Sequence, residues 1–550
     1  MATRRVEHVP DSLHEAGQKS RRSGAVETWL ETHSNLSALI VLMVAFAVRL
    51  RAASGTFLNP DEALHFQLAN KNSWAEAYRA SLTSAHPPGL IFVLHFWRGL
   101  GTSEVMLRLP SVIAGTAFCW IGFKWLTKLL GNTAGWIGFI LLAFLPPLIE
   151  LSAEIRQYAL LLLFVATAAY FLERAIEENS AGWMLFSAGA LYLAMLTHYS
   201  ALLFAAAMGG YTLLRMFTGG FAKKIIFAWG VGQAGALALF LFLYKTHLSG
   251  LNGNNGQGTH LFAANSFLHN SYFYSGQENP LFFAVAKTGG VFQYLFGQLV
   301  IGDIAFVFFL VAIVILFRGG RKTSVEGVAA WQLALVLALP FIFNCAAALA
   351  GRYPYGGNRH CVFLAMFAVG AISYLLAMAV GQRTLHGAAL AIVLVVACNL
   401  FGKPRAPYIL RADQRKTHME QALGAIEQHI PSSDLIFADY ESGLLLGHYL
   451  CQQKPVSFDD SPHGFQKFRC GGHTVIAVHP EPMIFTAENF LIRWEQLANS
   501  RHLPSGERIW VVQAGWDVRL ASQLSKAGDF QLTHFQSFGG NIELFTLDVQ

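Results

Sequence analysis

The sequence predicts a mainly α-helical protein that spans a membrane many times and ends in a soluble α/β domain. Of its 550 residues, 54% are hydrophobic and only 13% are charged, and the mean hydropathy is +0.41. Such values are typical of polytopic membrane proteins and argue against a soluble globular fold. The net charge is +6, and the basic residues lie between apolar runs rather than in one patch. We therefore expect no nucleic-acid partner.

Apolar runs near the ~20 residues that a membrane-crossing helix needs predict about eleven transmembrane helices. They cover residues 35–53, 109–130, 134–151, 157–176, 183–197, 200–217, 225–245, 296–317, 328–349, 361–381 and 385–402. The run at 87–101 is too short to cross ~30 Å of hydrocarbon, so we expect a re-entrant or surface helix there. With an inside N-terminus, every inner loop then carries Lys or Arg, as the positive-inside rule requires.

Three regions follow from this topology. Residues 1–33 are polar and lack the apolar core of a signal peptide, so they predict a disordered cytoplasmic tail. Residues 34–402 form the membrane domain, whose first outer loop, 54–108, is expected to carry surface helices, among them an amphipathic helix at 63–69 lying along the membrane. The same topology leaves residues 403–550 on the outer side.

The last region is predicted to be a small α/β domain, because short apolar runs alternate in it with helix-like stretches. The runs are 434–439, 474–478 and 508–512, and the helical stretches include 486–499 and 516–527. No glycine-rich phosphate motif follows any of these strands, so the domain is assigned no cofactor and is expected to be an acceptor platform or a lid. Cys451 and Cys470 fall here, where an oxidising compartment would allow them to pair.

Polar residues at the outer membrane boundary are candidates for function, because charged groups beside hydrocarbon are costly and usually kept for a purpose. The first group, Asp61 and Glu62, follows Pro60 directly after the first span. Further groups are His65, His86 before two prolines, Glu154 to Tyr158 after the third span, His198 and Tyr199 between spans five and six, and Arg352 to His360 after the ninth span.

An anionic ligand would explain three arginines on the side where the charge rule disfavours them. These are Arg156, Arg352 and Arg359. Guanidinium groups match phosphate oxygens in a bidentate manner, and Tyr353 and His360 supply further hydrogen bonds. The pattern therefore indicates a site for a lipid phosphate.

Each feature also has a structural explanation. Asp61 and Glu62 would suit a helix N-terminus, where the dipole favours acids. Arg156 would suit an ion pair with Glu150 or Glu154. His86 and His198 would suit satisfied interfacial positions, and Arg352 and Arg359 would suit anchoring to lipid head groups.

At these residues the chain resembles the C-type (GT-C) membrane glycosyltransferases, in the branch of the protein O-mannosyltransferases and the lipid A aminoarabinose transferase (families 39 and 83). The likeness spans most of residues 35–402. It rests on Asn59-Pro60-Asp61-Glu62, His86-Pro87-Pro88, Arg108-Leu109-Pro110-Ser111, Glu154-Ile155-Arg156-Gln157-Tyr158 and Tyr355-Gly356-Gly357-Asn358-Arg359-His360.

The resemblance implies the GT-C fold and an enzyme that moves a hexosyl or pentosyl group from a polyprenyl-phosphate donor to a hydroxyl of a glycan, lipid or protein acceptor. Transfer would occur on the extracytoplasmic face, with inversion, in a membrane such as the bacterial inner membrane. Asp61 would be the general base. The other roles would be as follows: Glu62 orients the acceptor or holds Asp61; Glu154 is a second catalytic acid; His86, Arg156, Arg352, Tyr353, Arg359 and His360 bind the donor phosphate; His65, Tyr158, His198 and Tyr199 bind substrate.

Two departures from the family pattern and one competing function stay open. His86 stands where some relatives have Lys, and Glu154 stands where they often have Asp. A divalent cation between Asp61 and Glu154 is an alternative that no ligand spacing demands, so no metal site is assigned. A transporter or flippase of an anionic polyprenyl lipid would also use many spans and interfacial arginines, although it would be expected to show internal repeats and broken helices near the midplane.

Overall fold

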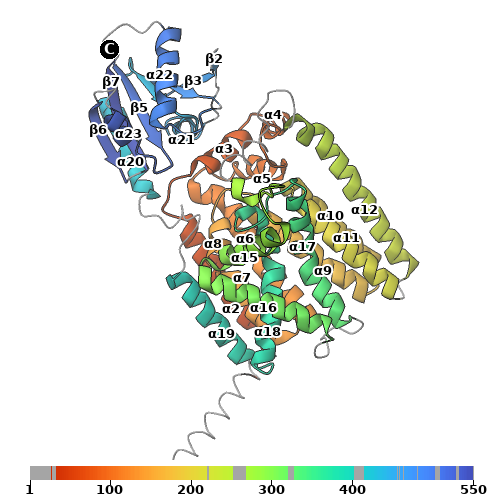
Figure 1. The fold of residues 1–550 in the computed structure, drawn as a ribbon. Coiled ribbons are helices and arrows are strands. Elements are labelled where there is room, and N and C mark those ends of the chain that lie inside the picture. Colours follow the sequence, from red (N-terminus) through yellow and green to blue (C-terminus); the bar gives the residue numbers. More distant parts are fainter. Residues whose placement is uncertain are drawn as a thin grey trace, which may run out of the picture.

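The computed structural model describes residue 27 and residues 32–219, 222–251, 268–319, 328–401 and 414–548, the last range with short gaps at 455, 457–458, 462–463, 480, 502–507, 528–531 and 540. A bundle of long helices carries a seven-stranded sheet domain at one end (Figure 1). We call this the domain-facing end of the bundle. The predicted tail at 1–33 lies almost entirely outside the described residues, and so does the predicted boundary at 402/403.

The bundle is built from helices whose bounds follow the apolar runs of the sequence. They are α2 (Ser34–Ala53), α6 (Glu104–Leu130), α7 (Asn132–Phe144), α8 (Pro146–Leu151), α9 (Tyr158–Glu177), α10 (Ala181–Thr197), α11 (Ala201–Thr218), α12 (Lys223–Leu243), α15 (Pro280–Phe296), α16 (Leu299–Phe317), α17 (Ala330–Leu349), α18 (Ala365–Ala379) and α19 (Thr384–Phe401). Shorter helices at the domain-facing end are α3 (Pro60–Ala69), α4 (Trp74–Ser81) and α5 (Gly89–Trp97). Single turns complete the bundle: η1 (Tyr244–Leu248), α13 (Ser249–Leu251), η2 (His269–Ser271) and η3 (Arg359–Leu364).

All eleven predicted spans are helical in the structure, but not all of them have the length of a membrane span. Among the described residues, nine helices have the length and hydropathy of a membrane span, and α7 and α10 are apolar but shorter. The run predicted as a surface helix contains α5, which has only nine residues and would span about 14 Å at 1.5 Å per residue.

One helix of the bundle, α15, is absent from the prediction. Its sequence is interrupted by Lys287 and by Gly289-Gly290, which lower its hydropathy below that of a span. It packs along α16 through rings such as Phe292 and Phe309, whose centroids are 5.2 Å apart. The hydroxyl of Thr288 also bonds that of Tyr355 at 2.8 Å. The missed helix thus supports the loop that precedes η3.

The predicted span at 134–151 is broken into α7 and α8, and a buried arginine repairs the break. Pro146 and Pro147 have no N–H groups, so the carbonyls of Leu142 and Ala143, four residues earlier, have no helical donor. Arg49, from the middle of α2, donates Nη2 to Leu142 O at 3.3 Å and Nη1 to Ala143 O at 2.7 Å. The guanidinium is fully buried and joins α2 to the break.

The C-terminal domain is an α/β domain built on a sheet with both parallel and antiparallel strands, which confirms the predicted fold class. Its strands are β1 (Leu435–Ala438), β2 (Asp459–Ser461), β3 (Phe465–Cys470), β4 (His473–Val478), β5 (Arg508–Ala514), β6 (Leu532–Phe538) and β7 (Ile542–Asp548), in the order β2-β3-β4-β1-β5-β7-β6. The predicted runs at 434–439, 474–478 and 508–512 are β1, β4 and β5, the parallel centre of the sheet. Antiparallel strands flank them on both sides.

Helices cover both faces of this sheet. They are α20 (Lys416–His429), α21 (Tyr440–Tyr449), α22 (Ala487–Arg501) and α23 (Leu520–Ala527). Side chains of a strand alternate between faces, so Phe437 of β1 packs among residues of α22 and α23 while Ile436 packs among those of α20 and α21. A disulfide joins Cys451 to Cys470, the pair predicted from the sequence.

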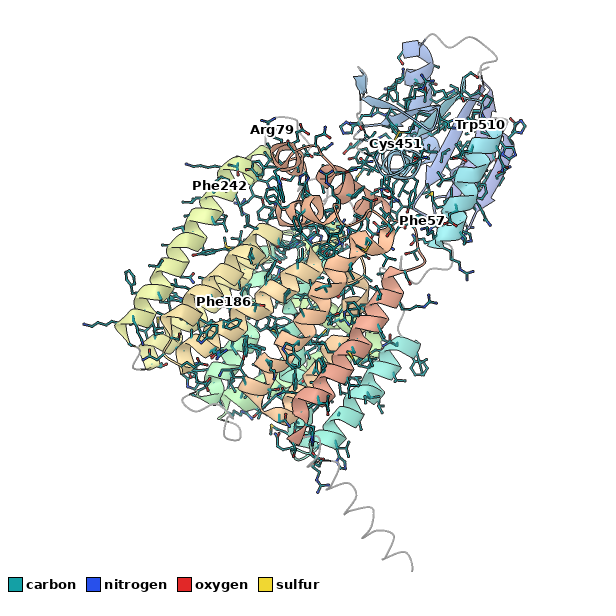
Figure 2. All side chains as sticks on the ribbon, turned by 180° about the vertical axis from the view of Figure 1, so that it is seen from behind. Phe57, Arg79, Phe186, Phe242, Cys451 and Trp510 are labelled. Carbon is teal, nitrogen blue, oxygen red and sulfur yellow. A yellow bond between two sulfur atoms is a disulfide. The ribbon has the colours of Figure 1, made fainter. Side chains whose placement is uncertain are left out.

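Helix α3 lies between the C-terminal domain and the bundle. The predicted amphipathic helix at 63–69 is part of α3, but Ala63, Phe66 and Ala69 are buried on contact with α5 and α21. Figure 2 shows Phe57, just before α3, at the junction of the two parts. The buried face of α3 is therefore covered by α5 and by the C-terminal domain, a contact that the sequence of the helix alone does not reveal.

Candidate active site

The N-terminus of α3 presents Asp61 at the domain-facing end. Asn59 is the cap residue: its Oδ1 accepts from the Glu62 N–H, and the Glu62 side chain accepts from the Asn59 N–H, both at 2.9 Å. Pro60 occupies the first helical position, where its missing N–H costs nothing. This capping box sets the direction in which Asp61, the next residue, leaves the helix.

Asp61 is paired with two arginines from distant parts of the chain. Its Oδ2 lies 2.8 Å from Nη1 of Arg156, in the loop between α8 and α9, and 3.0 Å from Nη2 of Arg359, at the start of η3. Burial alone would raise the pKa of Asp61, but the two guanidinium groups outweigh it and hold the pKa of this carboxyl well below its usual range. The Asp61 side chain is 27% exposed, so the cluster opens to solvent at this residue.

Glu62 faces away from Asp61, and its carboxylate is engaged in hydrogen bonds that hold α3 in place. Its two oxygens accept from Nε and Nη2 of Arg108 at 2.8 and 2.7 Å, and Oε1 also accepts from the Ile155 N–H at 2.8 Å. Arg108 also donates hydrogen bonds to the carbonyls of Ala53, Thr56 and Phe57. The pair, only 1% exposed on either side, fastens α3 to α6 and to the loop that carries Arg156.

Four histidines gather beside Asp61. His86 stacks on His198 with a centroid distance of 5.2 Å and lies 6.2 Å from His65 and 6.3 Å from His360. Tyr158 contacts two members of the group, and Tyr353 lies 6.5 Å from His198. The four predicted histidines therefore come together beside Asp61, although they belong to four separate segments: α3, the 85–88 turn, the α10–α11 turn and η3.

The imidazoles that lie outside membrane-spanning segments are neutral at physiological pH. Burial lowers the pKa of His65 to about 4 and that of His198 to about 3, and the Arg156 charge acts in the same direction on both. Burial and the neighbouring His198 hold the pKa of His86 well below its usual range. These rings therefore offer hydrogen bonds and flat surfaces rather than positive charge.

Glu154 completes the buried part of the cluster. Burial, assisted by the nearby Glu62 carboxylate, raises the pKa of Glu154 to about 7. Among the described residues, Glu154 Oε1, both polar atoms of Gln157 and the Tyr158 hydroxyl have no hydrogen-bond partner. Buried polar atoms left without partners are rare and usually mark a water or ligand position.

Two predicted site residues are not brought to this cluster. Arg352 is exposed, and no ion pair or ring contact joins its side chain to the cluster in the described part of the chain. Tyr199 turns away from the four histidines and bonds His247 Nδ1 at 2.5 Å, while His247 Nε2 bonds the Ser84 carbonyl at 2.7 Å. Tyr199 thus fastens η1 to the α10–α11 turn, and His247 fastens it to the turn before α5.

Arg108 is the residue that sequence reasoning used only as part of a motif. Its role depends on a contact with Glu62 across 46 residues, which spacing does not reveal. The available signal was an arginine at the start of an apolar run. Over the residues with described coordinates, no three His, Cys, Asp or Glu side chains are placed to share a metal ion.

Comparison with known proteins relates this arrangement to membrane glycosyltransferases. Residues 85–245 match the model of the dolichyl-phosphate-mannose-protein mannosyltransferase family. No curated protein sequence matches the chain.

Solved structures extend the likeness to nearly the whole chain. ArnT from Cupriavidus metallidurans, bound to undecaprenyl phosphate, aligns with a TM-score of 0.54 at 12% identity, over 94% of this chain and 98% of ArnT. Its apo form gives 0.52 at 12% identity, over 93% and 98%. The Archaeoglobus fulgidus oligosaccharyltransferase AglB, in complex with an inhibitory peptide and a dolichol-phosphate, gives 0.45 at 11% identity, over 93% and 74%. The resemblance predicted from the sequence is therefore confirmed: the chain has the fold of the C-type membrane glycosyltransferases, and its residues 85–245 match the protein mannosyltransferase family.

Proposed function

We propose that this protein transfers a sugar from a polyprenyl-phosphate donor to an acceptor hydroxyl, with Asp61 as general base and inversion at the anomeric carbon. The observation that carries the proposal is the pairing of one partly exposed carboxylate with two arginines at the mouth of a membrane bundle. A base and a phosphate-binding pair in contact are what a displacement reaction on a sugar phosphate requires. ArnT, which shares the fold, was solved with undecaprenyl phosphate bound.

Arg156 and Arg359 are proposed to bind the donor phosphate. A guanidinium forms two parallel hydrogen bonds with phosphate oxygens, and the leaving phosphate gains negative charge as its bond to the sugar breaks. Their cationic groups already lie within 3.0 Å of an anionic oxygen of Asp61, so the site is arranged for negative charge before the donor arrives.

Donor binding would also activate Asp61. While both arginines face it, the Asp61 carboxylate is a weak base, because its pKa is held low. A phosphate that draws the arginines to itself removes this stabilisation and raises the basicity of Asp61. The acceptor oxygen then attacks the anomeric carbon, its proton passes to Asp61, and the bond from the anomeric carbon to the phosphate oxygen breaks to release polyprenyl phosphate.

The remaining cluster residues would shape the sugar pocket. The neutral rings of His65, His86 and His198 provide flat walls and hydrogen bonds for a hydroxylated ring, together with Tyr158 and Tyr353. Glu154 is proposed to present a hydrogen bond to the same pocket through its unpartnered Oε1. Glu62 holds α3 in place, so its proposed part is to position Asp61.

The reaction is proposed to occur on the extracytoplasmic side, with the N-terminus in the cytoplasm of a bacterial cell. Basic residues support this orientation: Lys124 and Lys128 end α6, Arg215 ends α11 and Lys223 begins α12. All four belong to the helix ends opposite those that meet the Asp61 cluster. Positive charge of this kind favours the cytoplasmic side. The acceptor is a glycan, a lipid or a protein.

The test is a donor-turnover assay with purified protein and a panel of undecaprenyl-phosphate-linked sugars, beginning with mannose. Wild-type protein should release undecaprenyl phosphate, and Asp61→Asn should lower the rate by roughly 10²–10⁴-fold, the usual range for loss of a general base. Asp517→Asn is the matched control, because it also removes a carboxylate paired with an arginine, Arg519, but in the C-terminal domain. Equal turnover by Asp61→Asn and wild type would refute the assignment. Movement of intact lipid across vesicles without release of phosphate would favour a flippase.

A further inference from the structure

Helix α21 joins the C-terminal domain to α3. Leu444 and Leu445 are buried in the cluster that contains Phe57, Ala63 and Phe66 around α3. Gln67 of α3 donates its side-chain N–H to the Leu444 carbonyl at 3.0 Å. The C-terminal domain therefore reaches the segment that presents Asp61.

Glu441 begins the stripe of α21 that faces α3. Residues three and four apart share a helix face, so Glu441 lies one turn before Leu444 and Leu445 on the same side. The helix does not need Glu441 as its cap, because Asp439 already accepts from the Ser442 N–H at 2.7 Å. Glu441 is only 8% exposed, and within the described chain its buried Oε2 has no hydrogen-bond partner.

Two observations place Glu441 beside the Asp61 cluster. Gly515 of the C-terminal domain approaches so closely that an added Cβ would lie 2.5 Å from Pro60 Cγ and 3.1 Å from Leu445 Cδ1. Pro60 precedes Asp61, and Leu445 follows Glu441 by one turn. Burial raises the pKa of Glu441 well above its usual range, and the carboxylates of Asp439 and Asp61 add to the effect, which requires them to be near.

We propose that Glu441 contacts the acceptor and that the acceptor is a saccharide, held through a hydroxyl next to the one that Asp61 deprotonates. The inference rests on the proposed function and gives the C-terminal domain a direct part in it. Burial favours the neutral form of this carboxylic acid, which both donates and accepts a hydrogen bond, as a sugar hydroxyl does. Asp61 of α3 and Glu441 of α21 would then lie on two sides of the acceptor. Two such acids match two neighbouring sugar hydroxyls better than they match the single hydroxyl of a serine or threonine.

The experiment separates donor and acceptor steps in the full-length protein. The donor is the labelled undecaprenyl-phosphate sugar that the wild-type protein turns over. The acceptor probe is a membrane preparation from source cells that lack this protein. We expect Glu441→Leu to raise the apparent KM for these membranes by about tenfold or more, and Glu441→Gln to stay within about threefold of wild type, because the amide keeps the neutral hydrogen bonds. The KM for the donor should be unchanged in both. Glu488→Leu, at the second position of α22 and exposed, is the matched control.

The outcomes are distinct. An unchanged membrane KM in Glu441→Leu, or equal losses in the Leu and Gln variants, would overturn the contact, and a raised donor KM would show a general structural defect instead. Mild alkali tests the acceptor class, since it cleaves sugars from serine and threonine but leaves sugar-to-sugar bonds intact. Label released by alkali would overturn the saccharide assignment. Absence of donor turnover by wild type would overturn the proposed function as well.

Discussion

Asp61 and Glu62 are adjacent in the chain yet lie in opposite environments. Asp61 is 27% exposed and meets Arg156 and Arg359 across an open site, whereas Glu62 is 1% exposed and bonded to Arg108. A helix turns by about 100° per residue, so neighbours at its start face different directions. One acid is left available for chemistry because the other holds the helix.

Replacement of Glu62 by alanine should destabilise the protein by about 3–5 kcal/mol. The change leaves Arg108 buried without its anionic partner, and breaking a buried ion pair from one side carries a cost of this size. Thermal or denaturant unfolding in detergent, followed by tryptophan fluorescence, measures it. Glu178→Ala, which breaks the exposed pair with Arg174, should cost far less stability, because water screens that pair. Equal losses in the two variants would contradict the role given to Glu62.

Glu154 should make the fold lose stability as pH rises from about 4.5 to about 7. Its pKa is near 4.5 when unfolded and about 7 when folded, so in this window the folded state binds the extra proton. Stability that depends on this proton is complete below pH 4.5 and is lost as pH rises through 7. The loss is about 3 kcal/mol, at about 1.4 kcal/mol per pKa unit.

Unfolding of wild type and Glu154→Gln across this pH range tests the assignment. The glutamine variant does not titrate there, so its stability relative to wild type should improve with rising pH. Parallel pH profiles for the two proteins would show that Glu154 is not protonated in the fold.

At the scale of elements, the α7–α8 break depends on a side chain from another helix. Arg49→Met should destabilise the protein, because it leaves the buried Ala143 carbonyl without a donor, at a cost of about 1–3 kcal/mol, and leaves the Leu142 carbonyl only the weak Cys119 thiol. In a Pro146→Ala/Pro147→Ala background the restored amides can serve these carbonyls, and the effect of Arg49→Met should shrink. Arg51→Met is the control, since Arg51 is exposed. A loss that is the same in both backgrounds would contradict this role.

The helices and strands that could be predicted are those whose own residues form the continuous apolar run expected of a membrane span or a buried strand. Every predicted span is a helix, and the three predicted strands are the buried parallel centre of the sheet, where continuous apolar runs are expected. Helix α15 escaped prediction because Lys287 and paired glycines interrupt its hydropathy. Strands outside the parallel centre escaped as well: β3 and β6, for example, are only partly buried and carry many polar residues.

At the scale of the whole molecule, the fit of the C-terminal domain on α3 should be sensitive to one methyl group. Gly515 has φ of +105°, and a Cβ there would meet Pro60. Gly515→Ala should therefore displace the N-terminus of α3 and lower donor turnover. Gly319→Ala has the same kind of backbone strain, with φ of +81°, but its Cβ would point into open space. Turnover should stay near wild type in the Gly319 variant, and equal loss in both would argue that strain alone is responsible.

The candidate site was predictable to the extent that topology alone gathers residues at one end of the bundle. This reasoning found Asp61, Arg156, Arg359, His86 and His198. It could not separate them from Arg352 and Tyr199, because the side to which a loop residue points depends on packing. It also could not find Glu441, whose link to Asp61 joins segments 380 residues apart in a domain without a recognisable motif.

The Cys451–Cys470 bridge makes the contact between the C-terminal domain and α3 sensitive to redox conditions. It lies at the end of α21, beside Gln453, whose carbonyl accepts from Asn70 and whose side chain accepts from Thr102, both near α3. Disulfides form where the surroundings are oxidising. Reduction of the bridge should therefore free the end of α21 from β3 and loosen the contacts that Gln453 makes with Asn70 and Thr102. Unfolding measured with and without a reductant would show this dependence.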